Sequence, residues 1–87
     1  MRLSRSADVI WREIDQHGVL LRVSTGDYCE INEVGLFVWQ NVGQDTDAHE
    51  IAERVAHAFD VDAKTAAADV SDFVRQLQKQ EMISVRP

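Results

Sequence analysis

The stretch TGDYCEINEVGLFVW, residues 25–39, decides the fold of this chain. It starts with a polar turn and a short β-prone segment, and it ends in an apolar helical segment. Asn32 lies between the two halves, where its side chain can accept a hydrogen bond from a free amide of the first helical turn. Glu33 suits the positive end of the helix dipole. Residues 25–39 therefore predict a strand, a cap and a helix with almost no linker between them.

Two more segments on the N-terminal side favour strands. Residues 9–14 are rich in β-branched and aromatic side chains, and residues 19–23 alternate between two faces. Polar turns at residues 15–18 and 24–27 join these segments to a third strand at residues 28–31. Such short connections predict an antiparallel meander, and its third strand has no later strand to pair with.

On the C-terminal side the pattern changes to helices. Asp47 with Glu50 resembles a capping box that opens a second helix, and Asp62 caps a third. The third helix carries its apolar side chains on one stripe: Ala66, Val70, Phe73, Val74 and Leu77. Residues 82–85 form an apolar tail expected to pack back on the core. Three strands followed by three helices are an α+β order, and 87 residues fit one domain, residues 1–87.

Composition narrows the class of protein. The hydrophobic content of 45% and charged content of 28% are ordinary for a soluble globular chain, and no apolar run approaches a membrane span. A net charge of −6 with scattered Lys and Arg opposes binding to phosphates. The third helix holds more acids than bases, which weighs against the main alternative of another class, a DNA-binding winged-helix regulator. A second alternative is a structural subunit that pairs edge strands in a homodimer.

Catalytic chemistry is not indicated. His49 and His57 lie two turns apart on one helix, too far to share a metal, and His17 falls in a turn. Cys29 has no nearby base in the sequence to activate it, and a single cysteine fits the reducing cytoplasm. No phosphate-binding loop is present. The sequence predicts a protein that is not an enzyme and that needs no cofactor and no metal.

Residues 28–39 resemble the signature of the PqqD-like family, the recognition domains for ribosomally made, modified peptides. The family pattern is a strand ending in a hydrophobic residue and Asn, then a small residue, then an aliphatic–Trp pair. Ile31-Asn32, Gly35 and Val38-Trp39 match it in order and spacing. Residues 50–52, 59–62, 67–77 and 81–83 resemble the family's later elements, so the resemblance covers nearly the whole chain.

The resemblance implies a winged helix-turn-helix-like fold, with a three-stranded antiparallel sheet followed by three α-helices. It also implies that the leader of a precursor peptide adds as a further antiparallel strand to the third strand, beside the third helix. Main-chain bonds then give affinity and side-chain pockets give specificity. The implied peptide-binding residues are Asp27, Tyr28, Cys29, Glu30, Ile31, Asp69, Val70, Asp72, Phe73, Gln76 and Leu77.

Within the family, residues 25–28 and the chain length favour a stand-alone lasso-peptide recognition protein. Such a protein works with a leader peptidase and a cyclase. The alternative is the peptide chaperone of the pyrroloquinoline quinone pathway, which serves a radical enzyme. Expected partners exclude nucleic acid and membrane, and we expect a cytoplasmic monomer or weak homodimer.

Overall fold

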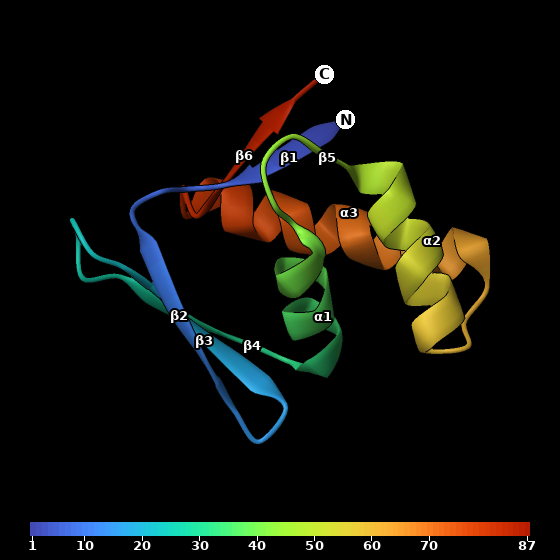
Figure 1. Ribbon diagram of the computed structural model, residues 1–87, viewed down its shortest axis with the longest axis horizontal. Helices are drawn as coiled ribbons and strands as arrows, with labels where there is room; N and C mark the ends of the chain where they lie inside the picture. The colour runs from blue at the N-terminus through green and yellow to red at the C-terminus, as the bar shows by residue number, and fades with distance from the viewer.

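The computed structural model describes residues 1–87 as six strands and three helices (Figure 1). The helices are α1 (Glu33–Asn41), α2 (Ala48–Ala58) and α3 (Ala63–Lys79). The strands are β1 (Arg2–Arg5), β2 (Val9–Ile14), β3 (His17–Arg22), β4 (Tyr28–Ile31), β5 (Thr46–Asp47) and β6 (Ile83–Arg86).

The predicted meander is present as an antiparallel sheet with the order β2-β3-β4. Its first turn is tighter than residues 15–18, because only Asp15 and Gln16 connect the strands, with φ of 51° and 68°. Positive φ at both positions of a two-residue loop matches the right-handed twist of the strands. His17 and Gly18 therefore belong to β3.

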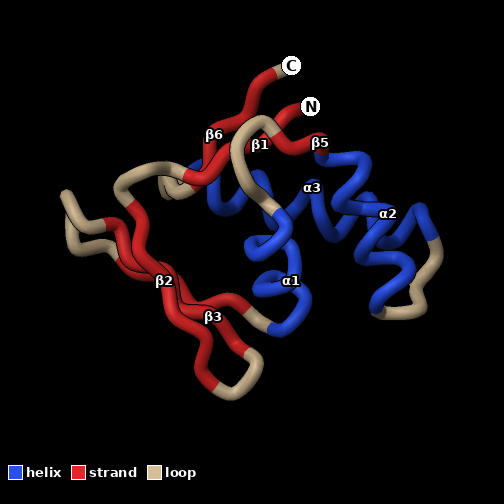
Figure 2. The backbone as a smooth tube through the Cα atoms, viewed as in Figure 1, coloured by secondary structure: helices blue, strands red, loops and turns tan.

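A second sheet, with the order β5-β1-β6, was not predicted. β1 pairs antiparallel with β6 from Arg2↔Arg86 to Arg5↔Ile83, so the two ends of the chain lie side by side. Figure 2 shows the two sheets as separate groups of strands. Three strands were thus too few, and the winged-helix description is loose, although the α+β class is confirmed. A short polar strand such as β1 gives little local signal, because its pairing depends on residues at the other chain end.

The helices begin at the predicted caps. The Asn32 Oδ1 atom accepts a bond from the Gly35 amide at 2.8 Å, and Asp62 Oδ1 accepts from the Thr65 amide at 2.7 Å. These bonds satisfy amides that have no partner inside the helix. The bond from Thr65 also lowers the pKa of the Asp62 carboxyl.

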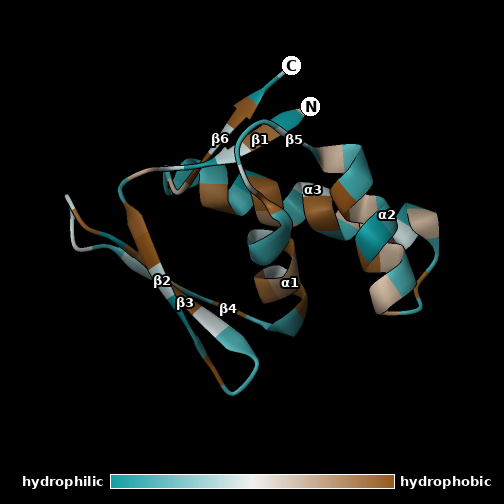
Figure 3. Cartoon of the chain, viewed as in Figure 1, coloured by the Kyte–Doolittle hydropathy of each residue, from teal (hydrophilic) through white to brown (hydrophobic).

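One core of 18 buried residues joins the helices to both sheets. Trp39 of α1 is fully buried at its centre, as are Leu3 of β1 and Leu20 of β3. Figure 3 shows hydrophobic and hydrophilic residues alternating along α3, as expected of a helix with one buried stripe. None of the three helices combines the length and apolar character needed to cross a membrane.

Gly35 fixes how α1 sits between β4 and α3. A Cβ atom at this position would lie 2.8 Å from Cε1 of Phe73 and 3.1 Å from Cβ of Ile31. The absence of a side chain at Gly35 thus allows α1 to approach Ile31 of β4 closely. The same contact brings in Phe73 of α3, so strand, first helix and third helix meet at one point.

Candidate functional site

β4 is an open edge of its sheet, since it pairs only with β3. The Arg22 amide donates to the Asp27 carbonyl at 2.8 Å, which marks a hydrogen-bonded pair. Antiparallel pairs alternate, so Cys29 and Ile31 also face β3 with their main-chain groups. The amides and carbonyls of Tyr28 and Glu30 therefore point to the open edge, where another extended chain can bond to them.

The side chains of β4 divide between the two faces of the sheet. Cys29 and Ile31 are 8% and 6% exposed and belong to the core, whereas Tyr28 is 70% exposed on the outer face. Burial, helped by the charge of Glu30, raises the pKa of the Cys29 thiol. A raised pKa disfavours the thiolate form that a cysteine nucleophile needs. Asp27 is exposed just before the strand.

A groove of about 320 Å³ begins where β4 ends and runs between α1 and α3. Val34, Val38 and Phe73 make its apolar part. The remaining lining residues are Asn32, Gly35, Asp69, Asp72 and Gln76. The groove combines apolar surface, hydrogen-bonding groups and negative charge beside a free strand edge, which is the arrangement that an extended peptide requires.

The structure brings together four of the six α3 residues predicted for the site. Asp69, Asp72, Phe73 and Gln76 all line the groove. The other two, Val70 and Leu77, are 2% and 0% exposed. Their side chains belong to the buried stripe of α3, together with Ala66 and Val74, so they support the wall and offer no surface to a ligand.

Four groove residues come from the cap and the first two turns of α1, and none of them is among the implied peptide-binding residues. They are Asn32, Val34, Gly35 and Val38. Val34 and Val38 are one helical turn apart and share a face, which was visible in the sequence. The sequence did not indicate that α3 leaves this face of α1 partly uncovered.

The acidic groups of the groove are accessible. Asp69 and Asp72 are exposed, and Asp72 pairs with Arg75 at 3.6 Å along the same helix. An exposed pair of this kind is weak, so Asp72 can exchange Arg75 for a basic group of a ligand. No group of three or more His, Cys, Asp and Glu side chains lies together as a metal site needs.

One protein-family model matches most of the chain. The sequence model described as "Coenzyme PQQ synthesis protein D (PqqD)" matches residues 17–83, which include β3, β4 and all three helices. No curated protein matches the chain.

Two solved structures share the fold over nearly the whole chain. One is TbiB1 in complex with the TbiA(beta) leader peptide, with a TM-score of 0.86 and 28% identity, covering 97% of this chain and 98% of the other. The second is lasso peptide synthetase B1 complexed with the leader peptide, with a TM-score of 0.84 and 18% identity, covering 98% and 100%. At that lower identity the second shows the fold alone.

Proposed function

Since the chain belongs to the PqqD family, we propose that it binds the leader region of a ribosomally synthesised precursor peptide by strand addition to β4, beside α3. The observation that carries this proposal is the open edge of β4 next to the α1–α3 groove. The similarity to TbiB1, a protein solved with a leader peptide, supports it. Residues 1–87 act as one domain around a single core.

The two parts of the site have different tasks. The outward main-chain groups of Tyr28 and Glu30 bond to the leader backbone, whatever its sequence. Alternate leader side chains point toward the helices, where Phe73 offers apolar contact and Asp69 and Asp72 favour basic residues. Tyr28 contacts side chains that point the other way.

The protein acts by binding, not by catalysis. It holds the leader in an extended form and presents it to the leader peptidase and the cyclase of a lasso-peptide pathway in the cytoplasm. The description of the family model favours a second candidate, a peptide chaperone for a radical enzyme in coenzyme PQQ synthesis. We favour the lasso-peptide pathway because residues 25–28 resemble the stand-alone lasso-peptide recognition proteins of the family. The similarity to TbiB1, solved with a leader peptide, supports leader binding itself.

A titration tests the proposal. The probe is a fluorescein-labelled leader peptide of the precursor encoded beside this chain, followed by fluorescence anisotropy. We expect saturable binding that weakens by about tenfold for Phe73→Ala, because an aromatic anchor contributes more than about 1 kcal/mol. Tyr28→Ala, at a 70% exposed position, should weaken it less.

Circular dichroism must show that both variants remain folded. Absence of saturable binding, or an affinity equal to wild type in both folded variants, contradicts the proposal. Binding of the leader of a coenzyme PQQ precursor in preference to the lasso-type leader supports the second candidate. Salt-sensitive affinity for any DNA duplex, with no leader binding, supports a DNA-binding regulator.

A further inference from the structure

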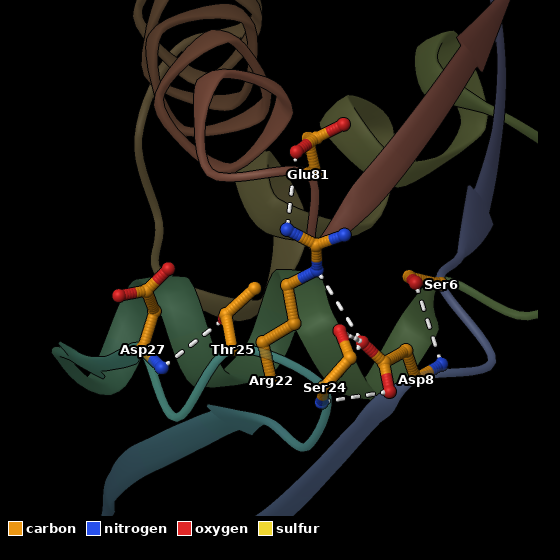
Figure 4. Close-up of polar contacts among 7 residues, drawn as sticks. All are labelled: Ser6, Asp8, Arg22, Ser24, Thr25, Asp27 and Glu81. Carbon is orange, nitrogen blue, oxygen red and sulfur yellow. Dashed lines mark hydrogen bonds and ion pairs between the residues drawn. The ribbon is translucent and has the colours of Figure 1, made fainter.

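Arg22, at the end of β3, links three segments that are far apart in the sequence (Figure 4). Its Nη1 atom donates to Oε2 of Glu81 at 3.0 Å, and its Nε atom lies 3.4 Å from Oδ2 of Asp8. Glu81 follows α3, and Asp8 lies between β1 and β2. Only 22% of the Arg22 side chain is exposed, so the guanidinium is held between these two carboxylates.

The backbone at the Glu81 end of this link is held by hydrogen bonds to the last turn of α3. Glu81 has a φ of 58°, and its amide donates to the Gln78 carbonyl at 3.0 Å. The next residue, Met82, is fully buried, and its amide donates to the Leu77 carbonyl at 3.0 Å. These bonds close the last turn of α3, so the position of Glu81 reports the position of the helix.

The Asp8 end is equally well defined. Its carboxylate accepts bonds from the amide and hydroxyl of Ser24, and these bonds together with Arg22 lower the pKa of the group. Ser24 belongs to the turn that leads into β4. The main-chain carbonyl of Arg22 accepts a hydrogen bond from the Gly26 amide at 2.8 Å. The Arg22 amide donates to the main-chain carbonyl of Asp27. Arg22 thereby holds the start of β4 from both its main chain and its side chain.

The edge of β4 is thus tied to α3 at two places. At the Asn32 end, Phe73 and Ile31 pack against Gly35. At the Asp27 end, the ion pair between Arg22 of β3 and Glu81 connects the sheet to the end of α3. We propose that Arg22, through Glu81, is the positioning residue that sets the separation between the β4 edge and α3, and with it the residence time of the bound leader.

This inference rests on the proposed function, and Arg22 acts without touching the leader. The test variant is Glu81→Gln, which removes the charge of a side chain that is 72% exposed and leaves the core intact. The matched control is Glu53→Gln, since Glu53 is 66% exposed and pairs with His49 inside α2 only. Arg22→Lys is the second variant, because a compact ammonium cannot bridge two carboxylates as a guanidinium fork does.

The first measurement needs no leader. Nitroxide labels on cysteines at positions 30 and 78, in a Cys29→Ala background, report the distance between β4 and α3 by pulsed electron spin resonance. We expect one narrow distribution for the parent and for Glu53→Gln. We expect a broader distribution for Glu81→Gln and for Arg22→Lys.

The second measurement is leader release, followed by stopped-flow anisotropy with the fluorescein-labelled leader on unlabelled protein. We expect Glu81→Gln to release the leader about two- to fivefold faster, the range that corresponds to an exposed ion pair. Arg22→Lys should have an effect of the same size, and association rates should stay unchanged. A purely structural role would instead lower the melting temperature without changing release from the folded protein.

The outcomes separate the two proposals. If distances and release rates of Glu81→Gln and Arg22→Lys equal those of wild type, the positioning role is overturned while leader binding stands. If distances broaden but release is unchanged, the positioning role is also overturned. If wild type binds no leader, the proposed function fails, and the positioning role fails with it whatever the distances show.

Discussion

The sheet β2-β3-β4 has two open edges, and only one of them borders the candidate site. β2 is the longer edge, with six residues against four, and it exposes Ile10 and Ile14 by 58% and 50%. By length and hydrophobicity alone, β2 is the better template for another strand. The groove of about 320 Å³ nevertheless begins at the end of β4.

The surroundings of β2 explain the difference. Its hollow toward α1 is smaller, about 180 Å³, and the Gln40 side chain donates across it to Glu13 at 3.4 Å. Arg12 and Glu13 also place charges in the middle of the strand, which disfavours pairing with another chain. The two edges therefore differ in what lies beside them: the groove at the end of β4 has both α1 and α3 as walls, whereas the hollow beside β2 is smaller.

The largest expected effect on leader affinity comes from placing a proline in β4, and the same change in β2 serves as the comparison. Glu30→Pro removes an outward amide of β4 but no bond to β3, so we expect leader affinity to fall about tenfold, as the loss of one to two hydrogen bonds implies. Glu13→Pro makes the same change on β2, because alternation from the Asp15–Gln16 turn also directs the Glu13 amide outward. We expect that variant to bind the leader as wild type does. Equal loss in both variants would remove the distinction between the edges.

The next largest effect, on both stability and leader affinity, is expected at Gly35, where β4, α1 and α3 meet. In Gly35→Ala the new methyl group conflicts with the Phe73 ring and with Ile31, so the ring must move into the groove. We expect a loss of about 1–2 kcal/mol in the free energy of unfolding by urea, since overpacking outweighs the better helix propensity of alanine. Leader affinity should fall as well.

Gly43→Ala is the matched control for this change. The nearest atom to its new Cβ is Oγ1 of Thr46 at 3.6 Å, an ordinary contact. We expect its unfolding free energy and its leader affinity to stay close to wild type. A Gly35→Ala protein of undiminished stability and affinity would show that Phe73 can relocate without narrowing the groove.

A smaller effect is expected from the two carboxylates in the α1–α3 groove, Asp69 and Asp72. Replacing Asp69 and Asp72 by Asn should weaken leader binding about two- to fivefold at low salt, the range of exposed ion pairs. The difference from wild type should shrink in 0.5 M NaCl, because salt screens exposed charges. Replacing Glu50 and Glu53 on α2 by Gln changes the net charge equally and should leave affinity unchanged. A similar loss in both double variants would indicate a general effect of charge.

The smallest expected effect concerns how the free energy of unfolding depends on pH. The folded protein holds the pKa of Asp8 below its usual 3.8, so its carboxylate stabilises the fold above that pH and loses this contribution as pH falls through the lowered value. Unfolding free energies measured from pH 6 to pH 3 should therefore depend less on pH in Asp8→Asn. Asp62→Asn should show a similar change, since Thr65 lowers that pKa too. Only Asp8→Asn should also speed leader release, because Asp62 lies far along α3 from Arg22.

Much of the fold could be predicted because it depends on neighbouring residues. Asn32 and Asp62 cap helices through amides three residues away, and the strand alternation follows from local geometry. The sheet of β5, β1 and β6 could not be predicted, because β1 pairs with the opposite end of the chain. The α3 side of the groove includes residues that the family resemblance implied, whereas the α1 residues that line it were not among them.

The sequence by itself determined the order of the three meander strands and the three helices, the caps, the buried stripe of α3 and the open edge at β4. These features depend on periodicity and on contacts within a few residues. The tertiary structure alone decided that α1 shares the groove with α3, and that Arg22 reaches Glu81, 59 residues away. The reason is that a side chain's long-range partner depends on how whole elements cross, and no local pattern records the angle between β4 and α3.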